Sequence, residues 1–175
     1  MISRLFLSSL FWLVLEASAL AQPARSPCGL PDPTCGSTLP NIVQASPGNP
    51  TGTSSTTAVM MGLAVAYTPK VTGTALVIIN GTIANASAIA DGGKVQIYYG
   101  TGTAPANAAS LTGTAAGAQV SYVAATTAEV SPFSLSATIT GLSSGTPVWV
   151  DVSLAAITGG TAALTNLSVS VVEVR

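Results

Sequence analysis

The side chains that could do chemistry in this chain are few, and histidine is absent from all 175 residues. Without an imidazole, Ser-His-Asp triads, histidine metal sites and histidine acid–base catalysis are excluded. Lys70 and Lys94 could serve a serine nucleophile as bases, but neither lies in a Ser-x-x-Lys motif. Both stand beside predicted strand starts, so we expect them to be solvated lysines at strand ends.

Four carboxylates follow residue 57, and two suitably spaced carboxylates could hydrolyse a glycoside. These are Asp91, Glu129, Asp151 and Glu173, of which Asp91 belongs to a turn, Asp91-Gly92-Gly93, and Glu173 lies beside the C-terminus. Asp151 interrupts a hydrophobic strand pattern beside Trp149. The simpler interpretation makes Asp151 a solvent-facing strand residue.

A second interpretation of Asp151 is a ligand surface. If Asp151 and Trp149 share an exposed face, they could bind carbohydrate together with a neighbouring tyrosine, Tyr98. Phosphate-binding loops, EF-hands and metal-ligand clusters are absent from the sequence. We therefore expect no enzyme, no cofactor and no metal.

Cys28 and Cys35 are the only cysteines, and six residues separate them. An exported protein can hold a disulfide, and the intervening prolines and glycine allow the segment to turn back on itself. A local Cys28–Cys35 loop is the main prediction. A bridge between two chains is the alternative.

The composition contains very little charge. Only 6% of residues are charged and the net charge is −1, whereas about 25% is typical of globular domains. Such a chain has no electrostatic footprint for nucleic acid or anionic lipid. Hydrophobic residues make up 48% of the chain but aromatic residues only 5%, which favours close packing of small side chains between sheets.

The first 21 residues have the pattern of a secretory signal peptide. Arg4 supplies a positive start, residues 5–15 are mostly apolar, and Ala19-Leu20-Ala21 resembles a cleavage site. The apolar stretch is too short to cross about 30 Å of hydrocarbon, and Glu16 ends it. We expect a secreted, cell-surface or periplasmic protein with no membrane span after cleavage.

Residues 22–57 are rich in Pro, Gly, Ser and Thr, which predicts a flexible linker. Residues 58–175 are expected to form one β-domain. A continuous apolar run at 74–80 suits a buried strand, and alternating patterns predict further strands at 94–99, 133–140, 147–154 and 166–171. Residues 104–118 are predicted to hold a loop and a short strand. The pattern is typical of an all-β antiparallel sandwich or barrel.

The order of these runs resembles the C1q/TNF-like jelly-roll family. Residues 67–79 resemble its turn glycine before a long apolar strand, residues 133–152 its strand, glycine turn and strand, and residues 167–174 its final strand. Residues 60–63, 100–107 and 155–162 are also similar to β-rich domains of phage tail-fibre and phage-derived bacterial proteins. The resemblance implies a compact homotrimer that binds a ligand or forms a fibre head without catalysis.

We therefore expect a β-sandwich of the jelly-roll type in preference to an Ig-like one. Its function would be that of an exported, non-enzymatic interaction or structural module that self-associates as a trimer. Self-association is one way to cover a sparsely charged β-surface. The alternative is an Ig-like or fibronectin-like adhesin that binds a cell-surface glycan or protein.

Overall fold

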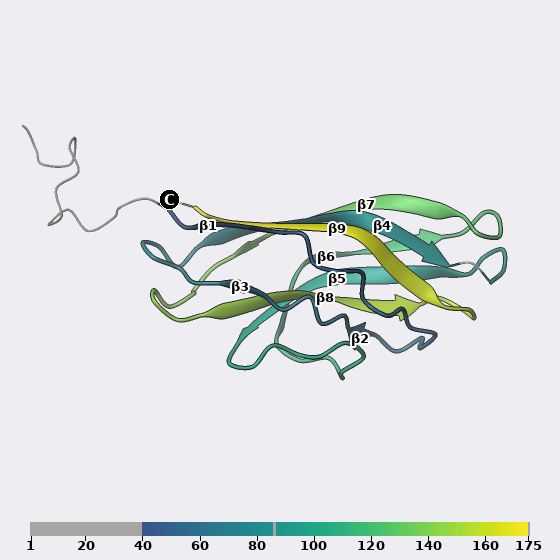
Figure 1. Ribbon diagram of the computed structural model, residues 1–175, viewed down its shortest axis with the longest axis horizontal. Helices are drawn as coiled ribbons and strands as arrows, with labels where there is room; N and C mark the ends of the chain where they lie inside the picture. Colours follow the sequence, from purple (N-terminus) through teal and green to yellow (C-terminus); the bar gives the residue numbers. More distant parts are fainter. Residues whose placement is uncertain (1–39, 86, 175) are drawn as a thin grey trace, which may run out of the picture. The chain divides into compact units, whose positions relative to one another are not determined.

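The computed structural model describes residues 40–85 and 87–174, which belong to the compact unit Thr38–Arg175. The predicted signal peptide and the Cys28–Cys35 loop lie outside the described residues. The described part is built from antiparallel strands in two sheets that face each other, as Figure 1 shows. The prediction of an all-β antiparallel sandwich is confirmed.

The first sheet, sheet A, has the strand order β1-β9-β4-β7. Its strands are β1 (Ile42–Ala45), β9 (Ala162–Glu173), β4 (Ala75–Asn85) and β7 (Val130–Ile139). β4 lies in the middle and pairs with β7 along ten residues and with β9 across an irregularity between Asn80 and Thr82.

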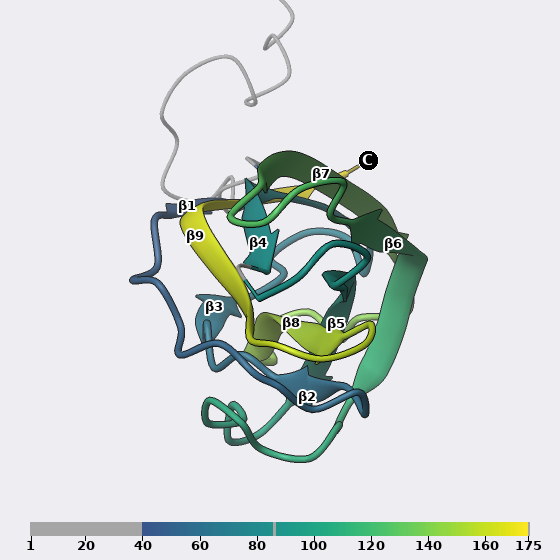
Figure 2. The same ribbon diagram turned by 90° about the vertical axis from the view of Figure 1, so that its right-hand side faces the viewer.

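The second sheet, sheet B, has the strand order β2-β8-β5-β6, and β3 also pairs with β8. Its strands are β2 (Val59–Met60), β3 (Val65–Tyr67), β8 (Val148–Ala156), β5 (Gly92–Thr101) and β6 (Thr114–Val123). Figure 2 shows the two sheets end-on as separate layers, with β6 at the side where sheet B comes close to β7.

The core lies between the sheets and is made of inward-facing aliphatic side chains. Alternate residues of a strand point to opposite faces, so each strand contributes every second residue. Most of the core residues are β-branched or leucine residues, and β-branched residues suit a pleated, half-buried surface. They include Val77, Ile79, Ile83, Val95, Ile97, Leu135, Ile139, Val150, Val152, Leu154, Val169 and Val171.

β8 differs from the other strands because all nine of its residues are buried. The odd-numbered residues point away from the core, where the edge segment 59–63, which begins with β2, and the loop 102–113 enclose them. Met60 donates its backbone N–H to Ala109 O at 2.9 Å, and Ala108 N–H bonds Met60 O at 2.8 Å. These two segments cover the outer face of sheet B beside β8, below the sheet in Figure 2. We call them the sheet B cover.

The predicted linker was wrong over its last part. Ile42–Ala45 forms an edge strand with β9, and Thr53 makes an isolated bridge to Ala162. Pro40 and Pro47 flank this four-residue strand, and their presence gave the whole stretch the composition of a linker. The sandwich therefore begins before residue 58.

Two other strand predictions need correction. β6 runs over Thr114–Val123, so it is longer and later than the short strand predicted within residues 104–118. The apolar run at 74–80 is a strand, but it is not buried on both faces, because Leu76 and Ile78 are only half-buried. No helix of the described residues is long and apolar enough to cross a membrane.

Candidate functional site: the uncharged outer face of sheet A

The fold leaves the outer face of sheet A uncovered, and backbone register brings its residues into rows. Val172 of β9 pairs with both Ile42 of β1 and Leu76 of β4. Leu76 in turn lies opposite Thr138 of β7. This first row places three aliphatic side chains side by side across the sheet.

The next rows become more polar. Ile78 lies between Ser170 of β9 and Ser136 of β7, and Ser170 lies opposite Gln44 of β1. We define the sheet A face as the outward residues of these rows and the row that follows them. They are Ile42, Gln44, Leu76, Ile78, Asn80, Ser134, Ser136, Thr138, Ser168, Ser170 and Val172.

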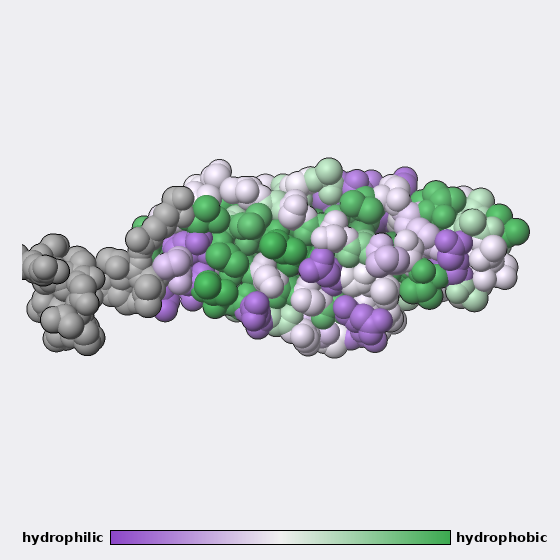
Figure 3. Space-filling model, turned by 90° about the horizontal axis from the view of Figure 1, so that it is seen from above, coloured by the Kyte–Doolittle hydropathy of each residue, from purple (hydrophilic) through white to green (hydrophobic). Residues whose placement is uncertain are grey.

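None of the residues of the sheet A face carries a charge. Ile42 is 58% exposed, and Leu76, Ile78 and Val172 are half-buried, so an apolar patch faces solvent. Figure 3 views the molecule from this side and shows hydrophobic side chains gathered over one part of the face. A shallow hollow of about 240 Å³ between β1 and β9 is lined by glutamine, alanine and serine residues.

The carboxylates of the acidic residues, in contrast, accept hydrogen bonds from backbone N–H groups. Asp151 is fully buried and accepts N–H bonds from Gly62 at 2.9 Å, Leu63 at 3.0 Å and Val152 at 2.7 Å. It thus holds the sheet B cover on β8. Burial raises the pKa of Asp151 above its ordinary value, and the three N–H donors oppose that increase.

Glu173 is the second buried acid, and it has four backbone donors. One carboxylate oxygen accepts from Asn41 at 2.9 Å, and the other accepts from Lys70, Val71 and Thr72 at 3.1, 2.6 and 2.6 Å. Burial opposes ionisation, but these N–H donors prevail and lower the pKa of Glu173 to about 2.

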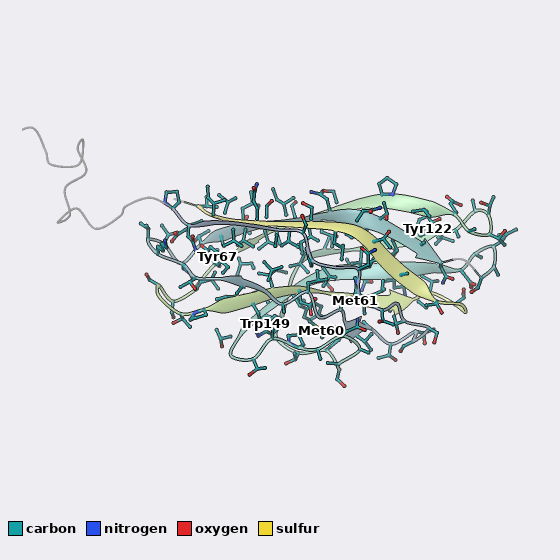
Figure 4. The ribbon with its side chains drawn as sticks, in the orientation of Figure 1. Met60, Met61, Tyr67, Tyr122 and Trp149 are labelled. Atoms are coloured by element: carbon teal, nitrogen blue, oxygen red, sulfur yellow. The ribbon has the colours of Figure 1, made fainter. Side chains whose placement is uncertain are left out.

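Glu173 also affects Tyr67 in the core beside it. The Tyr67 hydroxyl is buried and has no hydrogen-bond partner among the described residues. Burial, and then the negative charge of Glu173, raise the pKa of Tyr67 to about 12. Figure 4 shows this tyrosine directed between the sheets.

The other two acids cap loops in the same way. Asp91 accepts bonds from the Thr158 hydroxyl and from Gly159 N–H, the latter at 3.0 Å. Glu129 accepts N–H bonds from Ala125 at 2.7 Å and Thr126 at 3.1 Å. Among the described residues no group of three or more acids, cysteines or histidines could hold a metal ion.

The structure brings the three predicted ligand residues to one face but covers two of them. Tyr98 of β5 lies directly opposite Asp151 of β8. Trp149 precedes Asp151 by two residues on β8, so its side chain lies on the same outer face of sheet B. Tyr98 is half-buried, Trp149 is 5% exposed and Asp151 is 0% exposed. The expectation that Trp149 and Asp151 share an exposed face is therefore wrong, because the sheet B cover lies over both.

The simpler interpretation, a solvent-facing Asp151, is wrong for the same reason. Alternation along the strand predicted correctly that Asp151 points away from the core. It could not show that a distant segment, residues 59–63, returns to that face and supplies two N–H donors. Lys70 is exposed and Lys94 half-buried, and both stand near strand ends, as predicted.

The sheet A face was missed by sequence reasoning, although the sequence contained a signal. The run at 75–79 is apolar at every position and so on both faces of the strand, a pattern that suits a strand covered on both sides. The structure covers β4 on one side only.

The comparisons with known proteins add little. No known family model matches the chain, and no curated protein is similar to it. A solved structure described as "Structure of infectious bursal disease virus Gx strain" aligns with a TM-score of 0.41 and 12% identity. The alignment covers 77% of this chain and 33% of that one, so the chain spans about a third of its length. Neither the C1q/TNF-like nor the phage tail-fibre resemblance is confirmed.

Proposed function

We propose that this protein is an exported, non-enzymatic structural or interaction module whose sandwich self-associates as a trimer through the sheet A face. One observation carries the proposal: β4 has apolar side chains on both faces, but only its inner face is covered. Leu76 and Ile78 remain half-buried beside Val172 and the exposed Ile42.

The chemistry of the sheet A face supports contact with another protein surface. Burying a charge without a partner is costly, whereas hydroxyl and amide groups can exchange water for hydrogen bonds across an interface. The sheet A face offers only aliphatic, hydroxyl and amide groups. Contiguous apolar surface of this kind commonly marks an interaction site.

The strand order supports the jelly-roll form of the sandwich. The connections β3–β4, β4–β5, β6–β7, β7–β8 and β8–β9 all pass from one sheet to the other. The first and last strands, β1 and β9, are neighbours in sheet A. Paired Greek keys of a jelly roll produce such crossings. An Ig-like sandwich instead places the first two strands side by side in one sheet.

A non-catalytic role is supported by the fate of the acids. Asp91, Glu129, Asp151 and Glu173 each accept backbone N–H bonds that hold loops in place. Export rests on the signal-like sequence of residues 1–21, and three copies rather than two rest on the resemblance to the C1q/TNF-like family. The adhesin alternative loses its proposed surface, because Trp149 and Asp151 are covered.

Light scattering on the exported chain tests the proposal. At micromolar concentration we expect a mass three times that of one chain. A monomer mass under these conditions would contradict self-association. A dimer mass would leave the sheet A face as an interface but would overturn the trimer.

A further inference from the structure

A pocket of about 250 Å³ opens at the end of the sandwich where β5 ends and β8 begins. One wall comes from the last residues of β5 together with Thr114 of β6 and Val148 of β8. The other wall is the loop that joins β7 to β8, which contributes residues from Thr140 to Thr146. The pocket lining includes no residue of the sheet A face and none of the residues predicted to bind a ligand.

The lining is neutral and rich in hydroxyl groups. No lining residue is charged, and six carry a hydroxyl. These six are Tyr99, Thr101, Thr114, Thr140, Ser143 and Thr146. The hydrogen bonds found between described side chains and their surroundings use none of these hydroxyls. Each can both donate and accept, so together they suit a ligand that is itself hydroxylated.

The remaining lining is apolar. The half-buried side chains of Tyr99 and Leu142 and the buried Val148 stand beside the hydroxyl groups. A pyranose ring has the matching chemistry, because its edge carries hydroxyls and its C–H face packs against aromatic or aliphatic side chains. A carboxylate in this pocket would lose water without gaining a counter-charge from the lining.

Both walls are held in place by contacts outside the pocket. The Trp149 Nε1–H donates to Thr101 O at 3.2 Å, and its ring lies where a Cβ on Gly100 would come within 2.5 Å. Trp149 thus fixes the β5 wall from the outer side of sheet B, where Figure 4 labels it. A wall fixed in advance lowers the entropic cost of binding.

The loop wall is tied down as well. Leu142 N–H bonds Gly73 O at 2.9 Å, and Gly145 N–H bonds Pro69 O at 2.8 Å. The Ser144 hydroxyl donates to Lys70 O at 3.1 Å. These bonds anchor the loop to residues 69–73, which precede β4.

We propose that this pocket binds one neutral sugar ring, either as a free monosaccharide or as the terminal unit of a glycan. Its volume is below the 300–1,000 Å³ usual for drug-sized ligands, which fits a single ring. Trp149 acts as a positioning residue for the pocket wall and not as a platform for the sugar. The proposal does not rest on self-association, because all lining residues come from one chain.

Saturation-transfer NMR on the exported chain tests the pocket. The probes are the methyl glycosides of glucose, galactose, mannose, N-acetylglucosamine and glucuronic acid. We expect at least one neutral glycoside to bind with millimolar affinity and the glucuronide to bind more weakly. Binding of no neutral glycoside up to about 50 mM, or equal binding of the glucuronide, would overturn the proposal.

Two hydroxyl-deleting variants locate the binding. Thr140→Val and Thr146→Val should each weaken the best glycoside by about fivefold, the size of one hydrogen bond. Thr127→Val removes a hydroxyl from the exposed loop between β6 and β7, outside both the pocket and the sheet A face, and should bind as the wild type does. Wild-type affinity in the Thr140→Val/Thr146→Val double variant would contradict the site.

The same experiment distinguishes the two sources of the sugar. An oligosaccharide that ends in the preferred unit should bind at least as tightly as the methyl glycoside. A tighter oligosaccharide indicates a surface glycan, and equal affinities indicate a free sugar. Light scattering on the same samples distinguishes failure of the sugar-binding proposal from failure of the trimer proposal. A monomeric chain that binds sugar would contradict only the trimer proposal.

Discussion

Asp151 and Glu173 are buried carboxylates, and backbone N–H groups donate hydrogen bonds to both of them. Their seven N–H donors come from residues 41, 62–63, 70–72 and 152, which lie far apart in the chain. Each carboxylate therefore joins a loop or a chain end to a strand. At this scale, the few acids of the described chain are structural.

Removing the Asp151 carboxylate tests this role. Asp151→Ala leaves three N–H groups without acceptors, and two of the three bonds are fully buried. We expect the free energy of unfolding to fall by about 2–4 kcal/mol, measured in urea at fixed chain concentration. Glu129→Ala, which frees two N–H groups at an exposed loop, is the control and should cost about 1 kcal/mol or less. Equal costs would contradict the account.

Glu173 predicts a pH dependence of stability. Its pKa is about 2 in the folded protein against an ordinary value of 4.5. A lowered pKa means that the carboxylate stabilises the fold fully above pH 4.5, and that this contribution is lost as the pH falls from 4.5 toward 2.

The Glu173→Gln variant isolates this contribution. It should unfold more easily than the wild type at pH 6, because the amide nitrogen cannot accept an N–H bond. The difference in unfolding free energy should shrink between pH 4.5 and pH 2 as the wild-type carboxylate becomes protonated. A difference that stays constant over this range would show that Glu173 has no lowered pKa.

The sequence alone shows which chemical groups these residues carry, but it does not predict which groups they contact. The absence of histidine and the scarcity of acids are visible directly. Alternation also placed Asp151 on the outward face of its strand. Two of the three donors to Asp151 come from a segment 88 or 89 residues earlier in the chain, and no local pattern encodes such a contact.

Among the elements, the sheet B cover has the least regular structure, and close packing fixes it. Gly113, in the cover, has a φ of +80°, and a Cβ there would come within 2.4 Å of the Trp149 ring. Trp149 is buried under the cover, and Met60 of the cover is itself buried, apart from the central core. The cover thus converts the outer face of β8 into a second, smaller interior.

Gly113→Ala tests the packing of the cover. Gly141 is a matched control, because its φ is +75° but a Cβ there would contact nothing within 4 Å. Both substitutions place an alanine in a left-handed backbone conformation, which destabilises both variants similarly. The two variants therefore differ in the steric clash of the new Cβ. We expect Gly113→Ala to be less stable than Gly141→Ala by about 1–3 kcal/mol, with a changed Trp149 fluorescence. Equal stabilities would contradict close packing of the cover on Trp149.

The strands were predictable where side chains alternate and less so elsewhere. The patterns at 94–99 and 133–140 predicted β5 and β7 because one face of each strand meets the core. β6 has little contact with the core and is rich in Ala and Gly, so its pattern is weak. β1 is only four residues long and lies at an edge beside prolines.

At the scale of the whole molecule, the scarcity of charged residues leaves one surface, the sheet A face, without any charge. The described acids are drawn into loops and the core, so the sheet A face presents only aliphatic, hydroxyl and amide groups. The apolar pattern of β4 was predicted to be buried, and in one chain it is half-exposed. A second copy that covers the sheet A face would reconcile the sequence pattern with the structure.

Sedimentation equilibrium of Ile78→Lys tests this central claim most directly. Lysine at the middle of the sheet A face can remain solvated in a monomer but would lose its hydration in an interface. Gln119→Lys adds the same charge to an exposed position of β6 in sheet B and serves as the control. We predict a trimer mass for the wild type and Gln119→Lys, and a monomer mass for a folded Ile78→Lys. An Ile78→Lys chain that keeps the wild-type mass, or a wild type that is itself monomeric, would contradict the claim.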